Sequence, residues 1–325
     1  MHTDTILVIG ESLIDIVRRP GCPPQFFPGG SPLNVAIGLG RLGNHPRLAT
    51  WFADDEYGRL IKDHCAQSGV GISTGSDGAA RTSTADASID DQGHATYVFD
   101  IDWRMPPVED DTPVLVHTGS IGALVAPGGM DVLEFVESTQ AFVTFDPNCR
   151  PSIMGDPDTV RPHVERYVAA SGLVKVSDED LMWLYPGITT EQEVKAQLRH
   201  WLDMGPDAVV LTRGGKGALA LMQTCTSADG QSAVNHESTW GNDSDGLYAE
   251  VSVPADTSHG LQDTVGAGDS FMAGLIHGIV TRGHPGDALL HNPDTLRAIL
   301  TESAAISGIT VSRAGANPPW LSELQ

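Results

Sequence analysis

The chain has 325 residues, of which 40% are hydrophobic, and its 42 acidic and 19 basic side chains give a formal net charge of −23. This length and apolar content allow a large buried core, which excludes intrinsic disorder. The acidic excess excludes binding to a nucleic-acid backbone, because that binding depends on clusters of Lys and Arg. No apolar run approaches the ~18 residues of a membrane span, so we expect no membrane partner.

The N-terminus and the cysteines indicate the compartment. The chain enters an apolar run without the basic start of a signal peptide. Its four cysteines are far apart in the sequence and include no C-x-x-C pair: Cys22, Cys65, Cys149 and Cys225. We therefore expect a cytoplasmic protein with free thiols.

Apolar runs alternate with amphipathic helical periods along most of the chain. The predicted strands are 6–9, 48–52, 114–117, 142–145, 173–176 and 208–211, and the predicted helices are 32–42, 57–67, 130–138, 160–169 and 191–204. Strands that are apolar throughout and separated by helices indicate a mostly parallel sheet between helices. The predicted fold is a single α/β domain over 1–325, with ligands beyond the carboxyl ends of the strands.

Two segments, 13–28 and 84–104, interrupt this alternation. The second contains Asp90-Asp91-Gln92-Gly93, which predicts a hairpin turn. Together they predict a small β-sheet lid, from about 11–30 and 82–105, although immobile surface hairpins fit the pattern equally well. One face of this sheet is predicted to be apolar, built from Ile14, Ile16, Phe26, Ile89, Tyr97, Phe99, Ile101 and Trp103. A polar stretch at 223–247 predicts a surface loop between strands.

Two glycine-rich segments resemble nucleotide-binding motifs without meeting their requirements. Residues 38–43 match G-x-G-x-x-G, but they lie inside a predicted helix, where the glycines favour close packing. The segment Gly214-Gly215-Lys216-Gly217 lacks the Ser or Thr that follows Lys in a phosphate-binding P-loop. The histidines show no zinc-ligand spacing.

The segment Asp263-Thr264-Val265-Gly266-Ala267-Gly268-Asp269-Ser270-Phe271 is the most informative part of the sequence. It leads into a long apolar helix that is predicted to stop near residue 283. A Gly-Ala-Gly run at a helix start lets the backbone approach a ligand and directs unpaired N–H groups at an anion such as phosphate. Asp269 then stands in the first turn, beside that anion. Taken alone, the pattern also fits an acidic helix cap.

Four further segments form one pattern with residues 263–271 through their order and spacing along the chain. They are Gly10-Glu11-Ser12-Leu13-Ile14-Asp15, Gly29-Gly30-Ser31-Pro32-Leu33-Asn34, 146–151 and 175–180. From Ile6 to about Pro319 the chain resembles the ribokinase-like (PfkB) carbohydrate kinases, and most of all their fructokinase and 2-keto-3-deoxygluconate kinase branch. The resemblance implies a mostly parallel sheet between helices with a β lid. It also implies ATP-dependent phosphorylation of a primary hydroxyl on a ketose or sugar acid.

The resemblance assigns roles around the sugar. Asp269 is the implied catalytic base, and the amides of Gly266, Ala267 and Gly268 form the implied anion hole for the transferred phosphoryl group. Asp15, Gly30 and Asn34 correspond to sugar-binding positions. Two arginines are implied substrate contacts: Arg150 near the phosphates, or alternatively in a surface ion pair, and Arg104 beside Trp103 at the end of the lid.

Further roles concern the nucleotide and cations. Ser177, Thr212, Gly214 and Gly217 match nucleotide-binding positions. The family's N-x-x-E pattern is Ser177-x-x-Asp180 here, so that Asp180, with Glu179 adjacent, is the implied carboxylate that organises hydrated Mg²⁺. A K⁺ site is implied at Asp263 and the carbonyl of Val265, completed by the carbonyls of Thr310, Arg313 and Gly315. Pro319 stands where the family often has a hydroxyl ligand.

Two other functions stay open at this point. A nucleoside or sugar-phosphate kinase would use the same fold, and a sugar-phosphate would require more basic residues than the lid offers. A catalytically silent sugar-binding sensor is the other alternative, because a fold alone does not establish chemistry. The lid aromatics further predict a homodimer through the lid. The expected ligands are a small sugar, ATP and Mg²⁺, with K⁺ as an activator.

Overall fold

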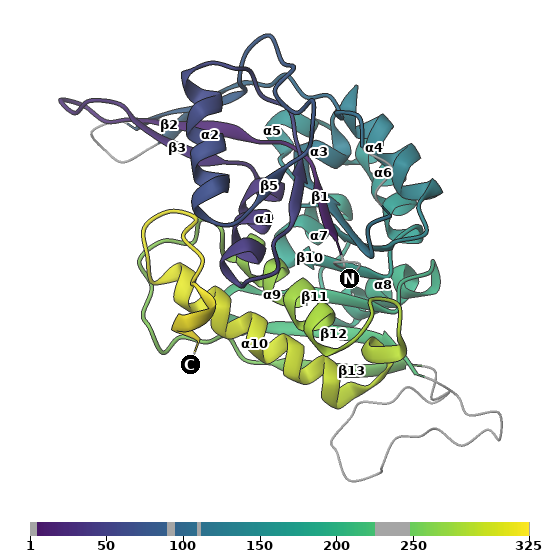
Figure 1. The fold of residues 1–325 in the computed structure, drawn as a ribbon. Coiled ribbons are helices and arrows are strands. Elements are labelled where there is room, and N and C mark those ends of the chain that lie inside the picture. The colour runs from purple at the N-terminus through teal and green to yellow at the C-terminus, as the bar shows by residue number, and fades with distance from the viewer. Residues whose placement is uncertain (1–4, 90–94, 109–111, 225–247, 325) are drawn as a thin grey trace.

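The computed structural model describes residues 5–89, 95–108, 112–224 and 248–324. Its centre is a nine-stranded sheet in the order β13-β12-β11-β10-β9-β8-β1-β4-β5 (Figure 1). Neighbouring strands are parallel from β5 to β11, whereas β12 and β13 are antiparallel. The strands are β1 Ile6–Ile9, β4 Arg47–Ala49, β5 Gly71–Ile72, β8 Leu115–Gly119, β9 Phe142–Asp146, β10 Leu173–Ser177, β11 Ala208–Thr212, β12 Ala218–Gln223 and β13 Tyr248–Val253.

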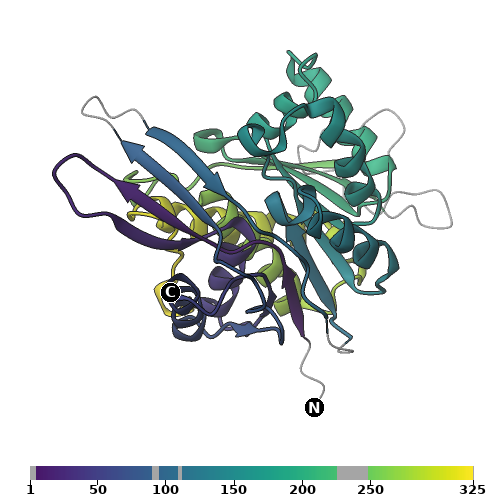
Figure 2. The ribbon, with the colours of Figure 1, turned by 90° about the horizontal axis from the view of Figure 1, so that it is seen from above.

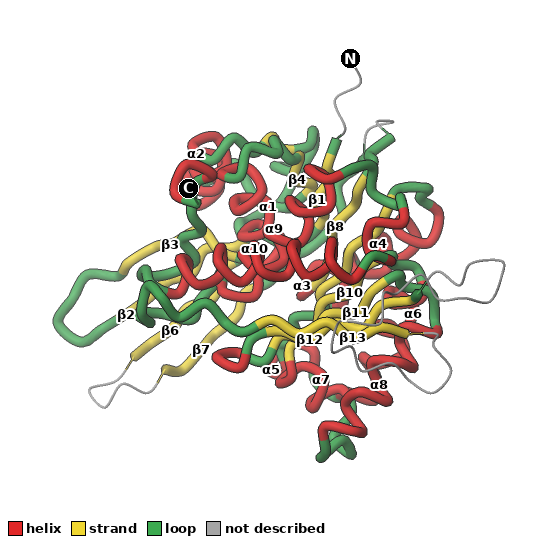
Figure 3. Tube along the Cα trace, turned by 90° about the horizontal axis from the view of Figure 1, so that it is seen from below, coloured by secondary structure: helices red, strands yellow, loops and turns green. Residues whose placement is uncertain are grey.

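Helices cover both faces of this sheet, as expected for strands that are apolar on both sides (Figure 3). One buried cluster joins the sheet to α1 Ser31–Arg41, α2 Glu56–Gln67, α9 Ala267–Arg282 and α10 Pro293–Val311. A second cluster lies under α3 Ser120–Leu124, α4 Gly128–Ser138, α6 Pro157–Ala169, α7 Asp178–Leu184 and α8 Glu191–Asp203. Shorter helical turns are α5 Pro151–Met154, η1 Gly214–Lys216, η2 Ala288–His291 and η3 Leu321–Glu323.

The lid is a separate four-stranded sheet that projects from the body (Figure 2). It consists of β2 Leu13–Arg18, β3 Gln25–Gly29, β6 Thr84–Ile89 and β7 Ala95–Asp100, in the order β3-β2-β6-β7. Its two chain segments meet through the parallel pair β2–β6, and its outer pairs are antiparallel. The predicted lid is thus confirmed as a sheet. The turn predicted at 90–93 lies outside the described residues.

The prediction of one apolar lid face was wrong. Ile14 and Ile16 are buried, and the Phe26 ring packs on Tyr57 of α2 at a centroid distance of 5.6 Å. Phe99 instead pairs with Ala85, which pairs with Asp15, and all three side chains line the cleft. Because side chains alternate along each strand, the predicted set is divided between the two faces. The lid therefore packs on α2 with one face and borders the cleft with the other.

Most predicted elements agree with the structure to within a few residues, with one clear exception. The strand predicted at 48–52 ends at Ala49. Beyond it the Phe52 amide donates to the Ser76 carbonyl at 2.9 Å and the Ala53 amide to Thr82 Oγ1 at 3.1 Å, so this apolar stretch is a buried loop. Residues 38–41 are helical in α1, as predicted, whereas 42 and 43 lie beyond its end. The predicted close packing is confirmed at Gly40, where a Cβ would lie 2.1 Å from the Ser68 carbonyl oxygen.

The polar 223–247 stretch lies between β12 and β13, as predicted, but its residues 225–247 lie outside the described part of the chain. So does Cys225, whereas Cys22, Cys65 and Cys149 are free thiols. Among the described residues, no helix combines the length and the apolarity that a bilayer crossing needs.

Candidate active site

The carboxyl ends of the parallel strands, the lid and the start of α9 enclose one large cleft, with a volume of about 2030 Å³. Sites for single small ligands are typically about 300–1,000 Å³. This cleft is therefore large enough for two substrates side by side. Almost all residues with predicted roles line it; the exceptions are Trp103, Arg104, Thr310 and Arg313.

The N-terminus of α9 presents backbone N–H groups to the cleft. Gly266 has a φ of +75°, and a Cβ there would lie 2.6 Å from Cβ of Ala316, so only glycine fits this position. The amides of Gly266, Gly268 and Asp269 have no acceptor among the described residues, whereas the Ala267 amide donates to the Thr264 carbonyl at 3.2 Å. Of the three amides predicted to form the anion hole, those of Gly266 and Gly268 thus lack an acceptor among the described residues, whereas a turn engages that of Ala267.

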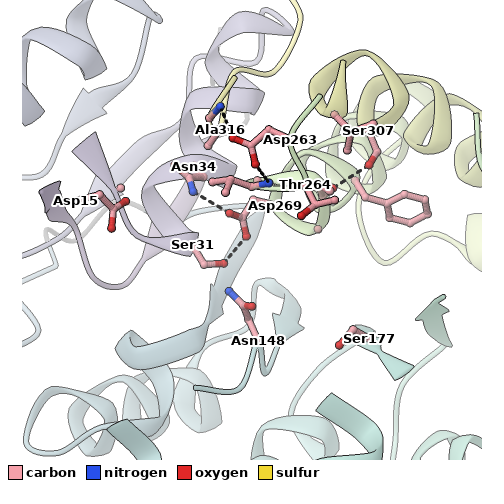
Figure 4. Close-up of a pocket in the computed structure, with 18 of the residues that line it drawn as sticks. Asp15, Ser31, Asn34, Asn148, Ser177, Asp263, Thr264, Asp269, Ser307 and Ala316 are labelled. Carbon is pink, nitrogen blue, oxygen red and sulfur yellow. Dashed lines mark hydrogen bonds between the residues drawn. The ribbon is translucent and has the colours of Figure 1, made fainter. Parts of the chain in front are cut away.

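Asp269 lies in the first turn of α9 with 8% of its surface exposed. Ser31 Oγ donates to Asp269 Oδ1 at 2.6 Å, and Asn34 Nδ2 donates to Asp269 Oδ2 at 2.8 Å (Figure 4). Both donors come from the start of α1, so two helix N-termini meet at this carboxylate. The carboxylate therefore borders the cleft in a fixed orientation beside the unpaired amides. The predicted sugar ligand Asn34 contacts Asp269 here, and sequence reasoning gave Ser31 no role.

Glu11, to which the sequence assigned no role, fixes the start of α1. Its carboxylate accepts from the Ser31 amide at 3.3 Å and from the Gly122 amide at 2.6 Å. Burial raises the pKa of Glu11 to about 7, and these hydrogen bonds oppose that rise. Gly30 must be glycine, because its φ is +110° and a Cβ would lie 2.6 Å from the Glu11 carbonyl oxygen.

The lid contributes Asp15 to the cleft. Burial raises the pKa of Asp15 to about 6, and the nearby positive charge of Arg150 opposes the shift. Arg150 also lines the cleft and donates through Nη1 to the Cys149 carbonyl at 2.9 Å. A carboxylate and a guanidinium thus both line the cleft.

Trp103 and Arg104 do not take the predicted place. The Trp103 ring is buried, and its Nε1 donates to the Gly122 carbonyl at 2.9 Å. A Cβ on Gly128 would lie 2.4 Å from the same nitrogen, so the ring packs into the body beneath α4. The chain has already left the lid at Asp100, and Arg104 is therefore exposed outside the cleft.

The predicted nucleotide positions lie along the neighbouring strand ends. Thr212, Gly214 and Gly217 line the cleft around the end of β11. Ser177 caps α7 by accepting from the Asp180 amide at 3.0 Å, and its hydroxyl donates to Asp180 Oδ2 at 2.6 Å. The second oxygen of Asp180 accepts from the Cys149 amide at 2.8 Å.

The structure indicates how a divalent ion would be held. No group of three His, Cys, Asp or Glu side chains in the described ranges could bind a metal directly. Asp180 and the exposed Glu179 nevertheless line the cleft beside the strand ends. Mg²⁺ usually retains several of its waters, so one or two carboxylates that act through water fit this arrangement.

Asp263 joins two loops behind the anion hole. Its Oδ1 accepts from the Val265 amide at 3.0 Å and its Oδ2 from the Gly315 amide at 2.8 Å. The Thr310 carbonyl accepts from the Arg313 amide at 3.1 Å. The residues of the predicted K⁺ site thus gather around one turn, although Thr310 and Arg313 do not reach the cleft.

A helix start with unpaired amides, a buried carboxylate in its first turn and a cleft for two substrates define a phosphotransferase of the α/β class. A family model described as "pfkB family carbohydrate kinase" matches residues 3–323. A fructokinase from Rhizobium leguminosarum bv. trifolii is 31% identical over 83% of this chain and 78% of its own length. The chain therefore belongs to the pfkB family of carbohydrate kinases.

Two solved structures share the fold over nearly the whole chain. A fructokinase from Xylella fastidiosa with bound ATP has a TM-score of 0.77 at 22% identity, covering 99% of this chain and 97% of its own. A fructokinase double mutant from Vibrio cholerae O395, with fructose, ADP and a potassium ion bound, has a TM-score of 0.72 at 20% identity, covering 97% and 94%. The protein is thus a carbohydrate kinase that is similar to fructokinases.

Proposed function

We propose that this kinase transfers the γ-phosphoryl group of ATP to a primary hydroxyl of fructose or a closely related ketose or sugar acid. The observation that carries the proposal is the position of Asp269, held by Ser31 and Asn34 beside three unpaired amides. This arrangement supports the proposal, because phosphoryl transfer to an alcohol requires a base beside an anion site. The similarity to fructokinases supports the choice of sugar.

In the proposed reaction, the oxygen of the sugar hydroxyl bonds to the γ-phosphorus, and Asp269 accepts the proton of that hydroxyl. The bond from that phosphorus to the bridging oxygen breaks, and its electron pair leaves with ADP. The amides of Gly266, Gly268 and Asp269 face the negative oxygens of the transferred group. Mg²⁺, when bound with ATP, neutralises phosphate charge, and Asp180 and Glu179 are placed to hold its waters.

On the sugar side, the proposal gives Asp15, Gly30 and Asn34 contacts with hydroxyl groups. Asp15 reaches the cleft from the lid, and Asn34 from α1. The cleft face of the lid adds the rings of Phe27 and Phe99, which would cover the apolar face of a sugar. Arg150, opposite Asp15, is proposed to contact the substrate from the body of the protein.

We extend the proposal to a monovalent cation and a dimer. Asp263, Val265 and Gly315 line the cleft beside the anion hole, and a potassium-bound fructokinase shares the fold. K⁺ activation is tested by replacing KCl with tetramethylammonium chloride at equal ionic strength. On the lid face that points away from the cleft, Phe26 and Val98 are 41% and 66% exposed, which supports a homodimer through the lid. Light scattering of the wild type and of Val98→Asp tests this.

An ADP-release assay over a sugar panel tests the function. The panel contains fructose, 2-keto-3-deoxygluconate, fructose 6-phosphate and adenosine. We expect the highest kcat/KM with fructose. Thermal stabilisation by a sugar without ADP release would instead support a silent sensor, and turnover of adenosine or fructose 6-phosphate alone would support the other kinase classes.

A further inference from the structure

A buried ion pair lies beneath the anion hole. Lys175 Nζ is 2.8 Å from Asp146 Oδ2, and the two side chains are only 3% and 2% exposed. The residues lie on the neighbouring parallel strands β10 and β9, near their carboxyl ends. Well-packed apolar residues would commonly stabilise a fold as well as a buried ion pair does. Stability alone therefore does not account for this pair.

The position of the ammonium group relates it to the phosphoryl site. A Cβ placed on Gly268 would lie 3.4 Å from Lys175 Nζ, so the charge stands against the first turn of α9. The amides of Gly266, Gly268 and Asp269, which lack acceptors among the described residues, belong to the same turn. Lys175 also lines the cleft. A full positive charge and a helix N-terminus thus meet at one point.

The surroundings contain an independent sign of a missing ligand. Asp146 Oδ1 is buried and has no hydrogen-bond partner among the described residues. The negative charges of the Asp180 and Asp269 carboxylates also repel the charge of Asp146. Lys175 is thus the cation paired with a carboxylate on which two further carboxylates act. A buried acceptor without a donor is costly, and a water that enters with a phosphorylated ligand would donate to it, whereas the phosphoryl oxygens themselves would face the ammonium group.

Resting on the proposed sugar-kinase function, we infer that Lys175 is a further catalytic residue, whose ammonium group contacts the non-bridging oxygens of the phosphoryl group during its transfer. Asp146 is its positioning residue. The Lys175 ammonium group itself forms and breaks no covalent bond: the sugar oxygen bonds to the γ-phosphorus, and the bridging oxygen leaves with ADP. The lysine thus opposes the charge that the three carboxylates would otherwise direct at the phosphoryl group.

The test separates catalysis from structure by removing both charges. In Lys175→Met the carboxylate of Asp146 is left buried and unpaired, which lowers stability as well as activity. In the double variant Lys175→Met/Asp146→Leu neither charge of this pair remains, so its Tm should be at least as high as that of Lys175→Met. A matched control is Lys195→Met, which removes a lysine 2.8 Å from Glu250, outside the cleft.

We expect the double variant to lose about 10²–10³-fold in kcat, the usual effect of removing one transition-state donor, with the sugar KM within a few-fold of the wild type. Asp146→Asn should lose less kcat, because the ammonium group remains. Lys195→Met should keep its kcat. A double variant with near wild-type kcat would overturn the inference. A wild-type protein without sugar turnover would instead defeat the proposed function, so the two failures are distinguishable.

Discussion

Ser31 Oγ donates a 2.6 Å hydrogen bond to Asp269 Oδ1, although 238 positions separate the two residues in the sequence. The bond joins the first residue of α1 to the first turn of α9, and these helices pack side by side on one face of the sheet. The proposed base is thus oriented by the helix that follows the lid. The predictions below concern this arrangement.

Replacing the proposed base is the most direct test. In Asp269→Asn the side chain keeps its size but cannot accept the sugar proton. We expect kcat to fall by about 10²–10⁴-fold, the usual contribution of a positioned base. Fructose binding, measured by calorimetry in the absence of ATP, should persist. Normal turnover by this variant would show that the base lies elsewhere.

Removing the hydroxyl of Ser31 tests the orientation of the base. Ser31→Ala deletes one of the two side-chain donors to Asp269. Hydrogen bonds to charged groups contribute about 1.5–3 kcal/mol, so we expect kcat to fall by roughly 10-fold or more. Ser31→Thr retains a hydroxyl and serves as the control. Equal kcat in the Ala variant and the wild type would contradict the predicted role.

The raised pKa of Asp15 predicts a pH dependence of sugar binding. Because this pKa is about 6, Asp15 is protonated below that pH and loses acceptor capacity for a sugar hydroxyl. The sugar KM should therefore rise as the pH falls from 7.5 to 5. Measured in the same buffers, Asp15→Asn should have a higher KM that no longer changes with pH. A pH-independent KM in the wild type would exclude Asp15 from sugar binding.

Glycine at the start of α9 is tested against a matched position. Gly266 and Gly155 have similar φ values of +75° and +78°, but only a Cβ at Gly266 would meet a neighbour, Ala316. Gly266→Ala should cost about 1–2 kcal/mol of stability from the left-handed backbone alone, and more from the contact with Ala316. Gly155, with a ψ of −120°, has another backbone conformation that favours glycine, so Gly155→Ala should also lose stability. Gly266→Ala should lose activity, while folded Gly155→Ala stays active. Denaturant unfolding and ADP release measure both effects.

Much of the fold could be predicted because hydrophobic periodicity is local. The strands at 6–9 and 208–211 carry continuous apolar runs, the strand at 142–145 carries one interrupted by Thr144, and their positions are confirmed to within one residue at each end. The strand predicted at 48–52 was too long, because the apolar side chain of Phe52 is buried in a loop and not in the strand. An apolar residue reports burial and does not distinguish a strand from a buried loop.

Residues of the site could be predicted only where they belong to a recognisable sequence motif. Gly266 and Asp269 stand out at a helix start, whereas Ser31 and Glu11 are ordinary residues whose roles depend on contacts between distant segments. Trp103 illustrates the opposite error. An aromatic residue near a predicted lid suggests a substrate contact, but its indole nitrogen is bonded to Gly122 in the body. Contacts between segments that are distant in the sequence decide such cases, and a single sequence does not show those contacts.

The lid strand β3 ends at Gly29 and α1 begins at Ser31, so a single residue, Gly30, connects them. This one-residue connection is too short to absorb a displacement of β3 relative to α1. Any displacement of β3 would therefore be transmitted through Gly30 to the start of α1, whose Ser31 and Asn34 hold Asp269. In the proposed reaction this connection would couple acceptor binding by the lid to the orientation of the base.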